Sequence, residues 1–88
     1  MSDMANTAID DRASAEQVRE HADELRAAAH EIGVTDVRLL DNGVVVVHSD
    51  DPGYRHVIAL VGRARDIVGS YVHVITDDVP AAVGAPPL

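Results

Sequence analysis

The chain has 88 residues and a formal net charge of −8, with 15 acidic residues against seven arginines and no lysine or cysteine. The lack of cysteine excludes disulfides, thiolate metal sites and a cysteine nucleophile, and the negative charge disfavours generic binding to nucleic acid or anionic membranes. No apolar stretch reaches the roughly 20 residues that a membrane span needs, so we expect a cytoplasmic protein.

The first regular element predicted is a helix. Apolar side chains recur every three or four residues from Val18 to Ile32, which places them on one side of a helix. Ser14, followed by Gln17 three residues later, predicts a capping box at its start. Gly33 predicts its end, because glycine readily takes the left-handed conformation that terminates helices.

The stretch LLDNGVVVVH predicts a β-hairpin. Asn42 and Gly43 are favoured central residues of a two-residue type I′ turn. Such a turn pairs Leu39 with Val46. Because side chains alternate along a strand, the four valines that follow the turn divide between the two faces of the sheet, and both faces are then largely apolar.

A second helix and a third strand follow the hairpin. Asp51 is the predicted N-cap, Pro52 occupies the first helical position, and Gly69 follows the last turn. The residues in 70–78 are rich in β-branched side chains, which favours a strand. Two strands joined by a helical crossover run parallel in a right-handed unit, so we expect the second and third strands to be parallel.

The predicted element order is αββαβ. It implies an α+β fold with a three-stranded mixed sheet and two helices packed on one face. We expect this single domain to cover residues 14–78, between a disordered N-terminal tail at 1–13 and a flexible C-terminal tail at 79–88.

This architecture leaves one apolar sheet face without a cover. Exposed apolar patches of that size usually mark an interface, and a homodimer formed through the sheet face or through a sheet edge is the simplest cover. The alternative is that one of the tails folds back over the patch. The residues expected to form the interface share the uncovered face: Leu40, Val45, Val47, Val72 and Val74.

Acidic residues follow both of the strands expected to be parallel. Asp50, Asp51, Asp77 and Asp78 should gather at the carboxyl edge of the sheet, where open α/β sheets tend to place ligands. Carboxylates are the ligands that Mg²⁺ and Ca²⁺ prefer, so these residues are candidates for a divalent cation site. The alternative is that Asp51 only caps a helix and the others only form loops.

The histidines show no metal-binding spacing along one helix, but His48 and His73 lie on strands expected to be adjacent and could approach each other. Arg55, Arg63 and Arg65 form the single basic cluster and are candidates for nucleic-acid binding. Because the chain has no aromatic platform and no Gly-rich phosphate loop, we favour a solvated helix surface or an interface with an acidic partner for these arginines.

The order of a helix, GVTDVRLL, a second strand, a helix and YVHVITDDVP resembles the minimal nucleotidyltransferase domain that serves as the antitoxin in some toxin–antitoxin pairs, over roughly residues 20–80. In that family a Gly-Ser signature follows the first strand and two alternating acids on the second strand bind the metal. Here a tight hairpin and Val44 to Val47 occupy those places, so no catalytic residue carries over. Type II KH and BolA-like domains have a similar αββαβ order, although the G-x-x-G loop with which KH domains bind RNA is missing.

The sequence therefore favours a small acidic protein-interaction or regulatory module that self-associates, possesses no catalytic constellation and resembles an antitoxin. A divalent-metal-binding protein or a metal-dependent enzyme that uses the Asp-rich edge is the first alternative. A nucleic-acid binder that uses the arginines of the second helix is the other.

Overall fold

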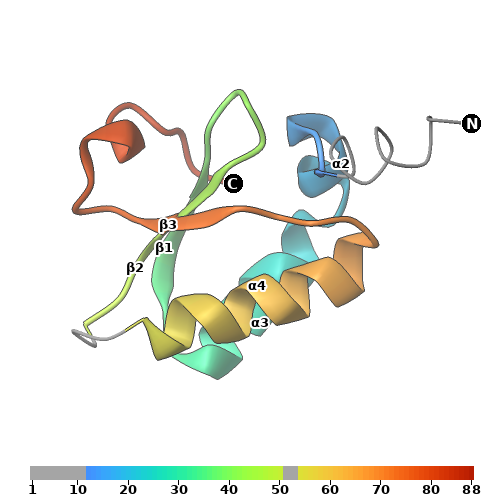
Figure 1. Cartoon of the computed structure of the whole chain (residues 1–88), viewed down its shortest axis with the longest axis horizontal. Helices are drawn as coiled ribbons and strands as arrows, with labels where there is room; N and C mark the ends of the chain where they lie inside the picture. The colour runs from blue at the N-terminus through green and yellow to red at the C-terminus, as the bar shows by residue number, and fades with distance from the viewer. Residues whose placement is uncertain (1–11, 51–53) are drawn as a thin grey trace, which may run out of the picture.

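The computed structural model describes residues 12–50 and 54–88, and these form a three-stranded mixed sheet with helices (Figure 1). The predicted α+β class and the αββαβ order are confirmed, with two helices in the place of the first. The elements are α2 (Ala15–Glu20), α3 (Ala22–Ile32), β1 (Thr35–Leu39), β2 (Val45–His48), α4 (Arg55–Val68), β3 (Val74–Thr76) and the short 3₁₀ helix η1 (Pro80–Ala82).

The first predicted helix is interrupted at His21, whose φ of −112° and ψ of 24° lie outside the helical range. Its amide donates to the carbonyl of Val18 at 3.0 Å, so the chain tightens by one residue between α2 and α3. The predicted ends are confirmed. Ser14 and Gln17 form the capping box, and Gly33 ends α3 with a φ of 109°.

The hairpin loop has three residues, so the predicted two-residue type I′ turn is wrong. The amide of Leu40 donates to the carbonyl of Val44 at 2.9 Å, and the amide of Gly43 donates to the carbonyl of Leu40 at 3.0 Å. A type I′ turn needs a positive φ at both central positions, but the φ of Asn42 is not positive. Its side-chain oxygen accepts from the Val44 amide at 3.1 Å and stabilises the longer loop, in which only Gly43 is left-handed, with a φ of 89°.

The longer loop shifts the predicted register by one residue. Leu39 pairs with Val45 and Arg38 with Val46, where the sequence had paired Leu39 with Val46. Leu39 and Val45 therefore face the same core, whereas Val46 points to the opposite side of the sheet. The ladder is also irregular before Arg38, where Asp36 takes a φ of 55°.

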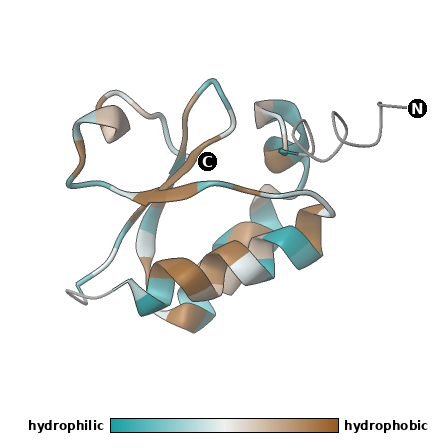
Figure 2. Cartoon of the chain, viewed as in Figure 1, coloured by the Kyte–Doolittle hydropathy of each residue, from teal (hydrophilic) through white to brown (hydrophobic). Residues whose placement is uncertain are grey.

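The main core lies between the helices and one face of the sheet. Buried residues of α3 and α4 share one apolar cluster with those of the strands, and Figure 2 shows hydrophobic residues where the strands cross the middle of the sheet. The predicted parallel pairing of β2 with β3 is confirmed, with Val45 opposite Val74. No polar or charged residue is buried in the part of the chain that the structure describes.

This core contains four of the five residues that were expected to lie on the uncovered face, so that expectation is wrong for them. Val45, Val47, Val72 and Val74 are at most 5% exposed and pack against the helix side of the sheet. Only Leu40 belongs to the other face, where it is half-buried. The one-residue shift in register separates Leu40 from these valines, because it moves β1 side chains to the opposite face relative to β2. The helices cover the face that holds the valines.

The second face of the sheet is covered by the C-terminal segment, where the sequence had predicted a flexible tail. Val46 is completely buried there by Ala82 and Ala85, and Leu40 and Ile75 pack around them. The alternative in which a tail folds back over the patch is thus the arrangement found. It has a simple physical basis, because small side chains allow the segment to approach a row of valine and leucine closely.

The same segment pairs with the outer edge of β1. The Leu39 amide donates to the carbonyl of Pro86 at 3.0 Å, and the Leu88 amide donates to the carbonyl of Val37 at 3.1 Å. Arg38 and Pro87 face each other in an antiparallel bridge. The backbone hydrogen bonds of residues 86–88 therefore protect the β1 edge, which would otherwise offer unpaired backbone groups.

At the other end, the predicted disordered tail lies outside the described residues except for its last two. Ala13 is 2% exposed, and its amide donates to the carbonyl of Tyr71 at 2.8 Å. A Cβ at Gly43 would lie only 2.7 Å from the Ala13 carbonyl oxygen, so the hairpin loop rests directly on the start of the domain.

The predicted helix start at Asp51 and Pro52 also lies outside the described residues.

We predict that Gly43→Ala lowers the free energy of unfolding by at least about 2 kcal/mol, because the new Cβ adds a clash with the Ala13 carbonyl to the strain of a positive φ. Gly69→Ala is the matched control, since Gly69 also has a φ of 89° but has nothing within 4 Å of the new Cβ. It should cost only about 1 kcal/mol. Urea denaturation compares the two, and equal losses would contradict the close contact.

A second prediction concerns the C-terminal cover. Ala85→Asp should lower the free energy of unfolding by at least about 2 kcal/mol, because it places a carboxylate against the buried Val46. Ala81→Asp, at an exposed position of the same segment, should change it by less than about 0.5 kcal/mol. Similar small effects of both substitutions in thermal or urea unfolding would show that the segment does not cover the sheet.

Candidate functional site

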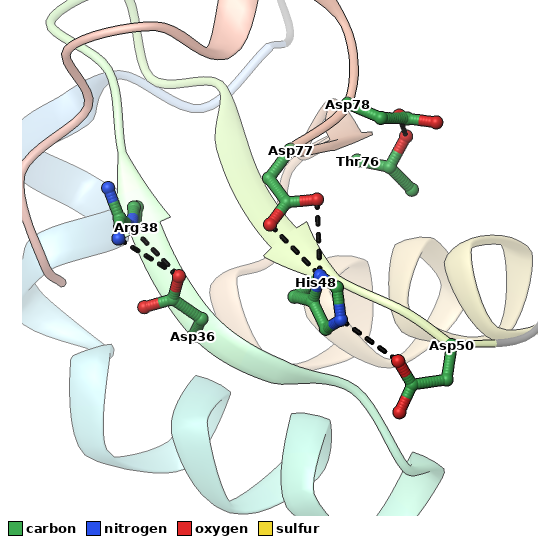
Figure 3. Close-up of polar contacts among 7 residues, drawn as sticks. All are labelled: Asp36, Arg38, His48, Asp50, Thr76, Asp77 and Asp78. Carbon is green, nitrogen blue, oxygen red and sulfur yellow. Dashed lines mark hydrogen bonds and ion pairs between the residues drawn. The ribbon is translucent and has the colours of Figure 1, made fainter.

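The carboxyl ends of β2 and β3 bring a histidine between two carboxylates (Figure 3). Nδ1 of His48 lies 3.0 Å from an oxygen of Asp77, and Nε2 lies 2.9 Å from an oxygen of Asp50. These three side chains come from the end of β2, the connection after it and the turn after β3. They form the most connected polar cluster at this edge of the sheet.

The parallel register explains this cluster. Val47 lies opposite Thr76, so the residues that follow them, His48 and Asp77, come next to each other. The amide of Asp77 donates to the carbonyl of Val47 at 2.9 Å and continues the ladder by one further bond. Asp50 then reaches the other side of the imidazole from two residues beyond His48.

The cluster favours the charged form of the histidine. A neutral imidazole has one N–H donor, whereas both ring nitrogens here face carboxylate oxygens that can only accept. The hydrogen bond with Asp50, followed by that with Asp77 and its charge, raises the pKa of His48 above its ordinary value of 6.5. The side chain is 46% exposed, so solvent screens much of this attraction.

The four aspartates predicted to bind a divalent cation do not converge on one point. Asp50 and Asp77 contact opposite nitrogens of the same ring, and Asp78 accepts a hydrogen bond from the hydroxyl of Thr76. Asp51 lies outside the described residues. Over residues 12–50 and 54–88, no three histidine or acidic side chains are placed to hold a metal ion. The Mg²⁺ or Ca²⁺ site stays a prediction without a geometric basis in these residues.

The expected approach of His48 to His73 is wrong. The register that places Val45 opposite Val74 separates the two histidines by four positions along the strands. Nδ1 of His73 lies instead 3.0 Å from the hydroxyl of Tyr71. The prediction used only the fact that the two histidines lie on adjacent strands. The register of those strands places Asp77 next to His48 instead.

The three arginines of α4 spread around about half of the helix circumference, since successive residues are about 100° apart. Arg63 donates to Glu31 at 2.9 Å and so links α4 to α3. Arg55 and Arg65 lie on the exposed side of the helix. The structure therefore engages Arg63 in an ion pair between helices, and it does not align the three candidates for nucleic-acid binding in a single row.

The sequence reasoning missed two exposed apolar residues on α4. Tyr54, directly before the helix, is 71% exposed, and Ile58, one turn later, is 69% exposed. The signal was available in the spacing, because Ile58 falls outside the stripe of Val57, Leu60 and Ala64 that faces the core.

Comparisons of the chain with protein-family models, with curated proteins and with solved structures find no match. Function must therefore be argued from this chain's own residues. Of the helices in the described part of the chain, none combines the length and the apolar character required to cross a bilayer.

The histidine cluster makes a prediction about pH. A folded-state pKa above 6.5 means that the contribution of His48 to stability is fully present below pH 6.5 and is lost as the pH rises through the folded pKa. We expect His48→Gln to destabilise the protein more at pH 5.5 than at pH 8.5, as measured by urea unfolding at both pH values.

The matched variant keeps the histidine and neutralises its partners. With Asp50→Asn and Asp77→Asn together, the NMR titration of the His48 ring should move down from the wild-type value toward the ordinary 6.5. An unchanged titration midpoint would contradict the role of the two carboxylates.

Proposed function

We propose that the chain is a non-catalytic protein-interaction module that associates with copies of itself through the exposed side of α4. The observation that carries this proposal is the pair of large apolar side chains at the start of that helix, Tyr54 and Ile58, each more than two thirds exposed. Ile58 projects from a regular helix whose other side is anchored in the core, and Tyr54 directly precedes that helix. A rigid element presents such side chains to a partner at little cost in entropy.

The state of the sheet supports this choice of surface. A bare sheet face was the first candidate for self-association, but one face lies under α3 and α4 and the other under the C-terminal segment. One edge of the sheet is also paired with residues 86–88. Association through either sheet face or through the β1 edge would require the domain to open, whereas association through α4 leaves the fold as it is.

The distribution of charge also supports it. Residues 54–69 contain three of the chain's seven arginines but only one of its 15 acids, Asp66. The α4 side is therefore the basic side of an otherwise acidic protein. Two copies of a chain with a net charge of −8 repel each other, and a contact that uses the same surface of both copies opposes fewer acidic residues at α4 than on the acidic remainder of the protein.

The non-catalytic part of the proposal is supported by the composition of the interior. Buried positions in the described residues are apolar throughout, and His48 and its aspartates lie at the surface with direct access to solvent. The strand that would carry the metal-binding acids of a minimal nucleotidyltransferase is filled by Val45, Val46 and Val47, each at most 2% exposed. If that resemblance reflects kinship, the kinship is with an antitoxin-like protein that binds without catalysis.

Sedimentation equilibrium over a wide range of protein concentration tests the proposal. We expect the mass to rise above 9.4 kDa with concentration in the wild type and to stay at 9.4 kDa in Ile58→Glu, because a carboxylate replaces the apolar contact. Ala27→Glu, which adds the same charge at an exposed position of α3, is the matched control and should associate as the wild type does. A wild-type mass of 9.4 kDa at every concentration would overturn the proposal.

A further inference from the structure

We infer that two copies pair through their α4 helices in antiparallel orientation about a twofold axis, so that each Ile58 packs over Gly62 of the other copy. The inference rests on the proposed self-association and adds the orientation of the partner and the residues that select it. It follows from the order of side chains around the exposed half of α4.

Gly62 lies on the side of α4 that points away from the core. At about 100° per residue, it lies nearly opposite the middle of the buried stripe formed by Val57, Leu60 and Ala64. A Cβ built at Gly62 would have nothing within 4 Å. Glycine in the interior of an exposed helix destabilises it relative to alanine, and nothing in the isolated chain requires glycine here. Close approach of a second backbone is the use of glycine that fits this position.

Ile58 lies one turn before Gly62 and is its natural complement. Ile58 is a branched side chain that is 69% exposed, and Gly62, which has no side chain, leaves open space on the same side of the helix. An axis that passes midway between these two residues brings each Ile58 over the Gly62 of the other copy. The contact forms twice and buries the two isoleucines without displacing any side chain.

The same axis matches the flanks of the helix. In an antiparallel twofold pair, the same flank of both helices meets, and residues equally far before and after the axis become neighbours. Arg55 and Asp66 lie on one flank, so the guanidinium of each copy meets the carboxylate of the other. Arg55 already has a contact within its own chain, and its five N–H donors leave capacity for a second acceptor.

Tyr54 and Arg65 lie together on the other flank. The axis brings the ring of each Tyr54 near the guanidinium of Arg65 in the second copy, where a cation–π contact can form. Tyr54 is 71% exposed in the single chain. Among the described residues, no other ring contacts its ring. Every exposed residue of α4 that is unusual for a solvated helix thus acquires a neighbour in one arrangement.

Parallel pairing is disfavoured by the same residues. It would set Ile58 against Ile58 and leave the space over Gly62 unfilled in both copies. The antiparallel arrangement uses the same surface on both copies, so it closes as a dimer and does not extend into a chain. One helix pair gives a small interface, and we expect a weak, concentration-dependent dimer.

A charge exchange tests the pairing. Arg55→Asp and Asp66→Arg, each alone, should raise the dissociation constant by about tenfold, because each creates two like-charged contacts in the dimer. The double variant, Arg55→Asp with Asp66→Arg, should restore it to within about threefold of the wild type. Sedimentation equilibrium of the full chain measures all four proteins, and circular dichroism checks that each is folded.

Gly62→Ala supplies a readout in which folding and association move in opposite directions. Alanine favours the helix, so the variant should unfold at a higher temperature than the wild type when both are dilute and monomeric, while its dissociation constant rises because the gap for Ile58 is reduced. Unchanged or tighter association of Gly62→Ala would overturn the pairing.

The two proposals fail in different ways. A wild type that stays at 9.4 kDa at all concentrations overturns self-association and the pairing with it. A wild type that dimerises, loses the dimer with Ile58→Glu, but shows no rescue in the double charge variant retains the α4 surface and overturns the antiparallel arrangement.

Discussion

The fold depends on the burial of β2 on both of its sides. This central strand consists of Val45 to His48, and its three valines are at most 2% exposed. Antiparallel hairpins in small domains usually leave one side to solvent, but a strand with no polar residue between its apolar ones cannot do so without exposing apolar area. The helices bury Val45 and Val47, and the C-terminal segment buries Val46. The C-terminal segment is therefore part of the domain.

That constraint also determines where function can reside. With both sheet faces covered and the β1 edge paired by residues 86–88, the surfaces left for contact include the outer edge of β3, the carboxyl edge of the sheet and the outer sides of the helices. The carboxyl edge holds His48 between Asp50 and Asp77, which ties the connection after β2 to the turn after β3. The outer side of α4 holds the exposed apolar pair and the basic charge, and it is the surface on which the proposed association relies.

The outline of this fold is readable from the sequence, because helix periodicity, capping residues and the crossover rule are local or nearly local signals. Gly33 and Gly69 mark the helix ends as expected, and the crossover makes β3 parallel to β2. The register of the hairpin is not local in this sense. Asn42 and Gly43 suit both a two-residue and a three-residue loop. The length of the loop decides whether Leu39 pairs with Val46 or, as found, with Val45.

The C-terminal cover and the His48 cluster were harder to foresee for the same reason. The alanines and prolines after β3 have neither strand nor helix periodicity. Their role is to bury Val46, and it becomes visible only when the position of Val46 in the sheet is known. His48 finds Asp77 through the register of two strands separated by a whole helix.

The most direct test of the account is a methyl NOE spectrum of the protein at a concentration dilute enough for it to be monomeric. If the chain closes its own sheet, the methyl groups of Val46 should show NOEs to those of Ala82 and Ala85. If Val46 shows no such NOE and its methyl groups respond to a soluble paramagnetic probe, the second face of the sheet is open and the account is contradicted.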